Sequence, residues 1–286
     1  MTTPTSLVAV TGSTGAIGGG VARRLSDAGV AQRLVVRDAS RAPDLPGTEV
    51  VVASYGDRGA VRDALAGVDT VLMVSAHESD DRVGEHRTFV EAAAEAGVRQ
   101  VVYLSFVGAS ATSGFLLGRD HGATEDVLRA SGLDWTFLRD NFYAEMLPLW
   151  AGDDGTLRGP ARDGRLAAVA QDDVADVAAV VLQDPRAHVG RTYDLTGPAA
   201  VSFAEVATML TDATGREHHY VDETMDEARA SRSGHDVPAW LVDAWISTYT
   251  AVADGELAAV SDDVATLTGH PATSVEEVVA RAAKNR

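Results

Sequence analysis

Three glycines near the start of the chain have the spacing of loops that bind dinucleotides. Residues 11–18 read Thr-Gly-Ser-Thr-Gly-Ala-Ile-Gly and follow an apolar run. The first glycine permits a tight turn, the second lets the backbone approach a pyrophosphate, and the third lets helix and strand pack closely. N–H groups at the start of the following helix would hold the anion. We expect cofactor contacts from Gly12, Ser13, Thr14, Gly15, Ala16, Ile17 and Gly18; the alternative is a glycine-rich turn without a ligand.

Arg37 ends the second expected strand, and Arg41 follows closely. In a Rossmann unit this position reaches the adenosine ribose, where an acid accepts from the 2′-hydroxyl of NAD. An arginine instead pairs bidentately with the 2′-phosphate of NADP. The neighbouring Asp38 is a possible ribose acceptor, and a solvated surface arginine is the other alternative. The sequence therefore favours NADP(H), with NAD(H) possible.

Two side chains are candidates for acting on a substrate. His121 is expected to open a helix beyond the fifth strand, where its imidazole could donate a hydrogen bond to a substrate oxygen. The alternative is a residue that contacts solvent or caps the backbone. Tyr143 could stack on a flat substrate, or it could be a core aromatic beside Phe142. We predict no metal site, since His218 and His219 are adjacent in sequence and would point apart.

The composition excludes several kinds of chemistry. The only lysine is Lys284, which rules out Schiff-base catalysis, a P-loop lysine and the Tyr-x-x-x-Lys pair of ordinary short-chain dehydrogenases. The chain has no cysteine and a formal charge of −18, so a cysteine nucleophile is excluded and binding to nucleic acid or anionic membranes is disfavoured. Without a signal-like N-terminus or a long apolar run, we expect a soluble, cytoplasmic protein.

These residues require a parallel sheet to position them. In the first half, short apolar runs alternate with helical patterns, which is typical of βαβ units covered by helices on both faces. The expected strands are Leu7–Val10, Leu34–Val36, Val50–Val52, Asp69–Val74, Gln100–Leu104 and Trp135–Leu138. Ligands bind beyond the carboxyl ends of such strands. We therefore expect further cofactor contacts from Ser75, Ala76, His77, Ser105, Phe106, Val107, Asn141 and Phe142.

The second half of the chain has a different character. A Gly- and Asp-rich loop over 152–164 precedes a helical stripe from Val174 to Leu182, and Ser202 and Ser274 begin capping-box patterns that open helices. We predict an α/β fold: a Rossmann doubly wound parallel sheet with a small, mainly helical C-terminal substrate domain. The expected division is an NAD(P)-binding domain over 1–150 and a substrate-binding cap over 151–286, with some segments returning to the sheet.

Several segments together resemble the NmrA-like atypical short-chain dehydrogenases, in particular bacterial NAD(P)H:quinone oxidoreductases and triphenylmethane reductases. The resemblance covers nearly the whole chain and lies in the glycine loop, 35–37, Ser54-Tyr55-Gly56-Asp57, His121-Gly122-Ala123-Thr124-Glu125, 138–143 and 269–274. It implies NADP(H) binding, with Asp57 as a further cofactor contact. It also implies a substrate cleft between a Rossmann domain and a small C-terminal domain.

The function expected from these features is an NADPH-dependent oxidoreductase that transfers hydride to a quinone or similar conjugated aromatic acceptor. Conjugation stabilises the product, so an active site without a Tyr-Lys pair is adequate. Two alternatives stay open: a non-catalytic NADP(H)-sensing regulator, and a tailoring enzyme acting on an aromatic polyketide. The expected partner is a small aromatic or quinone substrate, with neither nucleic acid nor membrane; the sequence does not decide between a monomer and a homodimer.

Overall fold

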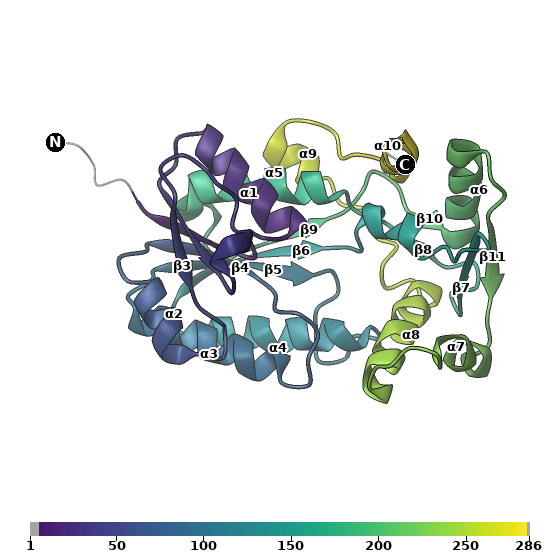
Figure 1. The fold of residues 1–286 in the computed structure, drawn as a ribbon, viewed down its shortest axis with the longest axis horizontal. Coiled ribbons are helices and arrows are strands. Elements are labelled where there is room, and N and C mark those ends of the chain that lie inside the picture. Colours follow the sequence, from purple (N-terminus) through teal and green to yellow (C-terminus); the bar gives the residue numbers. More distant parts are fainter. Residues whose placement is uncertain (1–5, 285–286) are drawn as a thin grey trace. The chain divides into compact units, whose positions relative to one another are not determined.

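The protein has an α/β fold built on one seven-stranded sheet (Figure 1), as seen in a computed structural model that describes residues 6–284. The strand order is β3-β2-β1-β4-β5-β6-β9, and β1 to β5 pair in parallel. The first six strands have the order of a doubly wound Rossmann sheet, so the predicted fold class is confirmed. The strands are β1 (Val8–Thr11), β2 (Gln32–Val36), β3 (Glu49–Val52), β4 (Thr70–Val74), β5 (Gln100–Phe106), β6 (Asp134–Asp140) and β9 (Arg191–Leu195).

Helices cover both faces of the sheet. Figure 1 shows α1 (Ala16–Asp27) and α5 (Gln171–Gln183) on one face, and α2 (Arg58–Ala64), α3 (Arg82–Glu95) and α4 (Leu116–Ala130) on the other. Every residue of β5 is buried, which explains why the strands read as apolar runs without alternation. Two short 3₁₀ segments, η1 (Ala39–Arg41) and η3 (Pro185–His188), belong to the connections.

The expected start of one helix was wrong. α4 begins at Leu116, so His121 lies inside the helix and does not open it. Leu117 is buried in an apolar cluster, and this packing extends the helix toward the N-terminus beyond the polar pattern from which its start was predicted. A helix boundary depends on such tertiary contacts as well as on local capping signals.

The chain divides into two compact units. Unit 1 comprises residues 6–105, 120–139 and 174–193, and unit 2 comprises 106–119, 140–173 and 194–284. The boundaries fall within β5, α4, β6, α5 and β9, so the chain passes from one unit to the other inside regular elements.

Unit 2 is built from helices and two small sheets. β7 (Thr156–Gly159) pairs with β11 (His219–Asp222), and β8 (Arg165–Leu166) pairs with β10 (Val201–Ser202). These strands were not predicted, because segments of two to four residues are too short to show alternation. The helical segments are η2 (Ala144–Leu149), α6 (Phe203–Thr214), α7 (Met225–Arg232), α8 (Ala239–Ala253), α9 (Asp263–Thr268) and α10 (Val275–Lys284).

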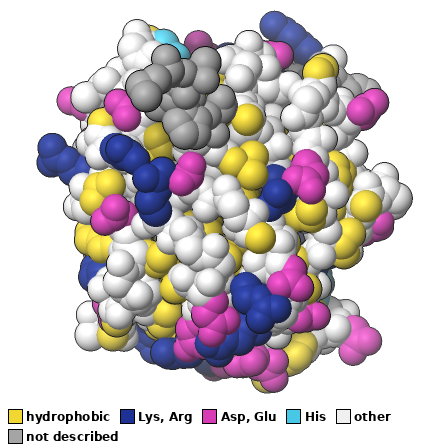
Figure 2. Space-filling view, turned by 90° about the vertical axis from the view of Figure 1, so that its left-hand side faces the viewer, with side chains coloured by type: hydrophobic (Ala, Val, Ile, Leu, Met, Phe, Trp, Pro, Cys, Tyr) yellow, Lys and Arg dark blue, Asp and Glu magenta, His cyan; other side chains and the backbone are white. Residues whose placement is uncertain are grey.

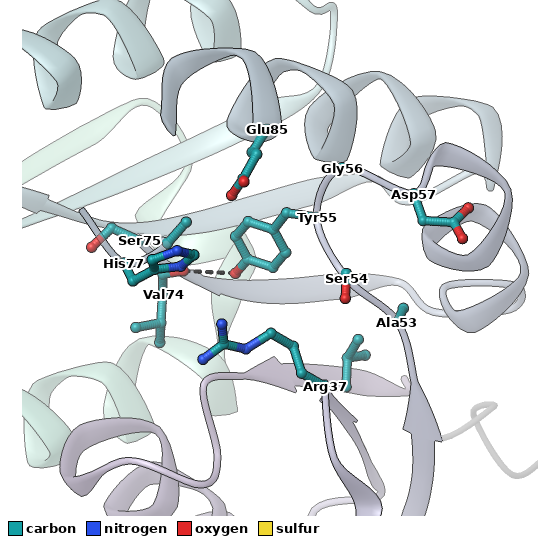
Figure 3. Close-up of a pocket in the computed structure, with 12 residues that line it drawn as sticks. Arg37, Ala53, Ser54, Tyr55, Gly56, Asp57, Val74, Ser75, His77 and Glu85 are labelled. Carbon is teal, nitrogen blue, oxygen red and sulfur yellow. Dashed lines mark hydrogen bonds between the residues drawn. The ribbon is translucent and has the colours of Figure 1, made fainter. Parts of the chain in front are cut away.

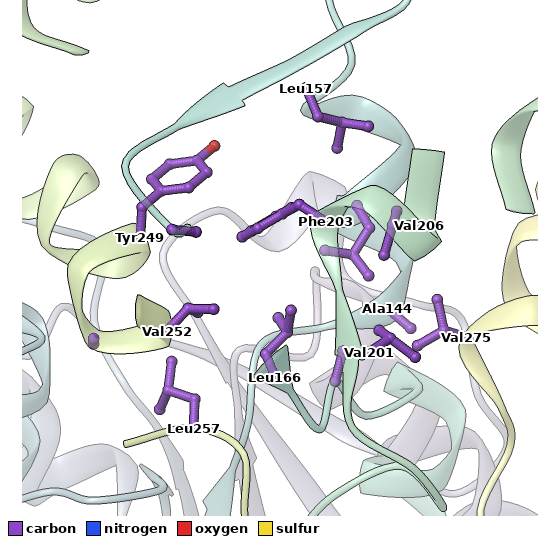
Figure 4. Close-up of a cluster of buried hydrophobic side chains, with 14 of the residues drawn as sticks. Ala144, Leu157, Leu166, Val201, Phe203, Val206, Tyr249, Val252, Leu257 and Val275 are labelled. Atoms are coloured by element: carbon purple, nitrogen blue, oxygen red, sulfur yellow. The ribbon is translucent and has the colours of Figure 1, made fainter. Parts of the chain in front are cut away.

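An apolar core holds unit 2 together. Tyr249 of α8 and Phe203 of α6 have ring centroids 5.1 Å apart, and Leu166, Val252 and Leu257 lie in the same cluster (Figure 4). The capping box predicted at Ser202 is confirmed, because Ser202 Oγ accepts from the N–H of Glu205 while the Glu205 carboxylate accepts from the N–H of Ser202. This cap fixes the start of α6, from which Phe203 enters the core.

The surface carries both signs of charge. On the face shown in Figure 2, Asp and Glu side chains lie among Lys and Arg side chains. Within residues 6–284, every helix is too short or too polar to cross a membrane.

Candidate functional site

The glycine loop joins β1 to α1 and requires glycine at two positions. Gly12 has φ +64°, and a Cβ there would lie 2.9 Å from Cβ of Val74. A Cβ on Gly18 would lie 2.4 Å from the carbonyl oxygen of Gly12. Gly15 caps α1 without a side-chain hydrogen bond, and the first turn contains no acidic residue. The first turn of α1 therefore places no carboxylate at the positive end of the helix dipole, and this fits a bound pyrophosphate.

A pocket of about 330 Å³ lies at the carboxyl ends of β2, β3 and β4 (Figure 3). We call it the Arg37 pocket. It brings together five residues predicted from the sequence: Arg37, Asp57, Ser75, Ala76 and His77. The lining that was not predicted comprises Val35, Ala53, Ser54, Tyr55, Gly56, Val74 and Glu85. Of these, Ser54, Tyr55 and Gly56 belong to a segment that carried the family resemblance. That segment could have identified them as site residues from the sequence.

Arg37 is the cation of this pocket. Its side chain is exposed, and it makes no ion pair or hydrogen bond within the described part of the chain. The neighbouring Asp38 is engaged elsewhere, since its carboxylate accepts hydrogen bonds from N (2.9 Å) and Oγ (2.7 Å) of Ser40. These bonds lower the pKa of Asp38. Arg37 is therefore available to an anionic group, and one carboxylate oxygen of the possible ribose acceptor caps η1.

Tyr55 forms one wall of the pocket and ties three strand ends together. Its hydroxyl donates to the carbonyl oxygen of Val74 at 2.6 Å (Figure 3). The same hydroxyl lies 2.6 Å from Oγ1 of Thr11. Thr11 Oγ1 in turn accepts from the N–H of Val74 (2.9 Å). Burial raises the pKa of Tyr55, so the phenol stays neutral and fixes the geometry at the ends of β1 and β4.

The peptide groups flanking Ala76 are held by two buried side chains of α3. His86 Nε2 accepts the N–H of Ala76 (2.8 Å), and Arg82 Nε donates to its carbonyl oxygen (2.9 Å). Because Nε2 is the acceptor, the ring proton is on Nδ1, 2.8 Å from Oγ1 of Thr124. The Thr124 hydroxyl in turn donates a hydrogen bond to the carbonyl oxygen of Asp120 (2.8 Å). Burial lowers the pKa of His86 to about 3, so a neutral imidazole fixes this wall of the pocket.

His121 belongs to the same buried network in unit 1. Its side chain is 7% exposed; Nε2 lies 3.3 Å from a guanidinium nitrogen of Arg82 and Nδ1 lies 3.0 Å from the hydroxyl of Tyr103. Burial and the charge of Arg82 lower the pKa of His121 well below its usual value. The proton-donor role stays a prediction, and these contacts favour a neutral side chain that supports Arg82.

Two further predicted cofactor residues of unit 1 make polar contacts within the protein. Ser105 is fully buried and donates to Glu125 (2.7 Å), which also binds Arg139 through both carboxylate oxygens. Asp57 caps α2 by accepting from the N–H of Ala60 (3.0 Å). Both side chains hold local structure, and a contact from either to a cofactor stays a prediction.

The remaining candidates belong to unit 2. Asn141 is buried, donates to the carbonyl oxygen of Leu257 (3.0 Å) and accepts from the N–H of Phe142 (2.8 Å). The hydroxyl of Tyr143 donates to the buried carboxylate of Asp140. The other predicted residues of this unit are Phe106, Val107 and Phe142. Phe106 and Val107 are buried, and Phe106 and Phe142 belong to the apolar cluster or pack against it.

A doubly wound sheet, a glycine loop and an adjoining arginine-bearing pocket define a dinucleotide-binding protein. Residues 12–185 match the NAD(P)H-binding family. The chain belongs to this family, within its NmrA-like atypical short-chain dehydrogenases, and the resemblance predicted from the motifs is confirmed.

Three similar proteins extend over nearly the whole chain. An NAD(P)H azoreductase of Xenophilus azovorans is 34% identical over 276 residues, which are 95% of this chain and 96% of the relative. An NADPH-dependent quinone oxidoreductase of Escherichia coli, solved with NADPH, is 31% identical with a TM-score of 0.88, covering 96% and 99%. A Citrobacter triphenylmethane reductase, solved with NADP(H), is 28% identical with a TM-score of 0.86 and the same coverage. The chain is an NAD(P)H-dependent oxidoreductase.

Proposed function

We propose that this protein uses NADPH to reduce a quinone or a similar conjugated aromatic compound. The observation that carries the proposal is that an azoreductase, a quinone oxidoreductase and a triphenylmethane reductase each align over at least 96% of their lengths. Each of these three names refers to an enzyme that reduces a conjugated compound. In the reaction, NADPH and one proton convert a quinone to a hydroquinone, and NADP⁺ is released.

The residues of unit 1 fit NADPH. The glycine loop and the N-terminus of α1 would hold the pyrophosphate, and Arg37 would pair with the 2′-phosphate. Its guanidinium makes no ion pair within the described residues, and this supports NADPH over NADH. Bound NADPH supplies the hydride, and the network of Tyr55, Arg82 and His86 keeps the pocket wall in one conformation.

The side chains that are candidates for a general acid among the described residues favour an acceptor that needs little proton transfer from the protein. His121 is buried and neutral, Tyr143 donates to Asp140, and the only lysine lies at the end of α10. A simple ketone would form a localised alkoxide on hydride addition and would depend on an acid. A conjugated acceptor spreads the charge over its ring system, so orientation supplies much of the rate.

The test compares acceptors in steady-state assays of NADPH oxidation. We expect kcat/KM for naphthoquinone to exceed that for decalone, a saturated bicyclic ketone of similar size, by at least about 100-fold, because acid assistance at full effect contributes about 10²–10⁴. The proposal would be overturned if no quinone or conjugated dye increased the rate of NADPH oxidation. It would also be overturned if kcat/KM for the ketone equalled that for naphthoquinone.

A further inference from the structure

A second pocket, of about 400 Å³, lies wholly within unit 2. We call it the Trp150 pocket. Residues 149–158 form one side, and α7, α8 and the turn between them form the other. Its volume is within the range of sites for small organic ligands, and it contains none of the candidate site residues predicted from the sequence.

Aromatic rings form much of this pocket. Trp150 and Tyr249 have ring centroids 6.0 Å apart with planes tilted by 47°. On the other side, Trp245 meets the ring of His235 edge to face at 5.6 Å. Both tryptophans are only half-buried, so apolar ring surface remains in contact with water. Exposed apolar surface of this kind marks binding sites, and planar aromatic molecules cover it well.

The charge of the pocket lining is unusual for this chain. The whole chain has 42 acidic against 24 basic residues, yet the described lining contains Arg158 and Arg232 and neither Asp nor Glu. Arg232 is fixed: it is 12% exposed, pairs with Glu223 at 2.9 Å, and lies 5.1 Å from the centre of the Tyr249 ring. It therefore maintains the pocket's shape, with its charge balanced by Glu223.

Arg158 is placed differently. Its side chain is 43% exposed and pairs with Asp154, which is 55% exposed. Ion pairs this open to solvent contribute little to stability, so Arg158 can exchange Asp154 for an anionic group on a ligand at small cost. A guanidinium recognises carboxylate and sulfonate oxygens through two parallel hydrogen bonds.

We propose that the Trp150 pocket binds a planar aromatic molecule that carries an anionic substituent. The rings lie against Trp150 and Trp245, and the anionic group pairs with Arg158. This inference concerns binding alone and goes beyond the proposed function, since it assigns a small-molecule site within unit 2. It gives the place of binding and the charge of the preferred ligand.

The experiment measures binding of two matched probes, naphthoquinone and its sulfonate, to the protein without NADPH. Quenching of tryptophan fluorescence reports binding, since two of the four tryptophans line the pocket. We expect Arg158→Gln to weaken binding of the sulfonate at least tenfold and binding of naphthoquinone less than threefold. Trp245→Ala is expected to weaken both probes at least tenfold.

Arg165→Gln is the matched control. Arg165 belongs to the same unit, is 46% exposed and pairs with a half-exposed Glu205, but it does not line the pocket. We expect this variant to bind both probes as the unmodified protein does. Equal effects of Arg158→Gln and Arg165→Gln, or binding of the sulfonate that neither Arg158→Gln nor Trp245→Ala changes, would overturn the inference. Thermal melting of each variant separates loss of binding from loss of folding.

Failure of this inference is distinguishable from failure of the proposed function. If the protein oxidises NADPH with naphthoquinone, but Arg158→Gln and Trp245→Ala bind the sulfonate as tightly as the unmodified protein does, the pocket assignment is wrong and the activity stands. If the sulfonate binds as expected but no quinone is reduced, the proposed function is wrong and the binding preference of the pocket stands.

Discussion

The Arg37 pocket and the Trp150 pocket have similar volumes, about 330 and 400 Å³, and each contains an exposed arginine, but their walls are built differently. Strand ends and turns form most of the Arg37 pocket, and buried side chains such as His86 hold its backbone. Side chains of helices and of one short strand edge provide much of the Trp150 pocket. Backbone walls suit a ligand that does not vary, whereas side-chain walls can change by substitution without altering the fold.

The largest expected effect tests the backbone contribution. Gly15→Asp should abolish measurable NADPH binding, a loss of at least about 100-fold, because a carboxylate would occupy the anion position at the N-terminus of α1. The fold should tolerate it: a Cβ on Gly15 lies 3.4 Å from its nearest neighbour, the carbonyl oxygen of Gly12, and Asp is a favoured N-cap. Calorimetry with NADPH provides the measurement.

Gly15→Asn is the control for this change. It has nearly the same size and capping ability without the charge, so it should bind NADPH more tightly than Gly15→Asp. Binding of naphthoquinone sulfonate should be the same in both variants if the two pockets act as separate sites. Equal NADPH affinity in the aspartate and asparagine variants would show that no anion lies at this helix end.

A smaller effect is expected at the arginine of the same pocket. Arg37→Ala should weaken NADPH about 10- to 100-fold and leave NADH nearly unchanged, since a charge-assisted pair contributes about 1.5–3 kcal/mol. Arg41→Ala is a suitable comparison, because Arg41 is also exposed and lies four residues further along. The measurement is the dissociation constant for each cofactor. If Arg37→Ala weakened the binding of NADPH and NADH by the same factor, Arg37 would have no role in recognising the 2′-phosphate.

The smallest effect on affinity is expected at His86, which acts through Ala76. His86→Leu removes the acceptor of a buried N–H and should cost about 1–3 kcal/mol of unfolding free energy, with a rise in KM for NADPH of about two- to tenfold. His86→Gln can both accept from Ala76 and donate to Thr124, so it should restore KM. A KM that is the same in the leucine and glutamine variants would mean that this hydrogen bond does not position the pocket wall.

The same histidine predicts a pH dependence of stability. The pKa of His86 is lowered to about 3 in the folded protein, while in the unfolded chain it is about 6.5. Between these values the unfolded chain binds the extra proton, so stability falls as the pH falls below about 6.5. Denaturant titrations should show that the unfolding free energy of His86→Gln falls less steeply with falling pH, by up to about 1.4 kcal/mol per pH unit. Identical slopes would contradict the assignment of a buried neutral His86.

Local rules were enough to predict one part of the site. The glycine loop follows from backbone geometry within a few residues, and the apolar runs located the ends of β2, β3 and β4 that carry Arg37, Ser54 and Ser75. The order of βαβ units then leaves few possible topologies. The fold and the grouping of several candidate residues in the Arg37 pocket were therefore accessible from the sequence.

Other parts depend on contacts that no local pattern encodes. Arg82 and His86 read as polar residues of a helix, yet they turn inward and bind Ala76 because the sheet end lies beside them. Tyr103 and Arg82 likewise determine what His121 contacts. The Trp150 pocket combines residues 149–158 with residues more than 70 positions later, and tryptophans of this kind are as typical of helix packing as of a binding site.

The position of Lys284 has a practical consequence. It is the only lysine, and it is exposed at the end of α10, whereas neither pocket contains a lysine. Apart from the α-amino group, reagents that modify primary amines therefore have one point of attachment. Coupling a dye or a solid support through Lys284 would leave the side chains that line both pockets unmodified.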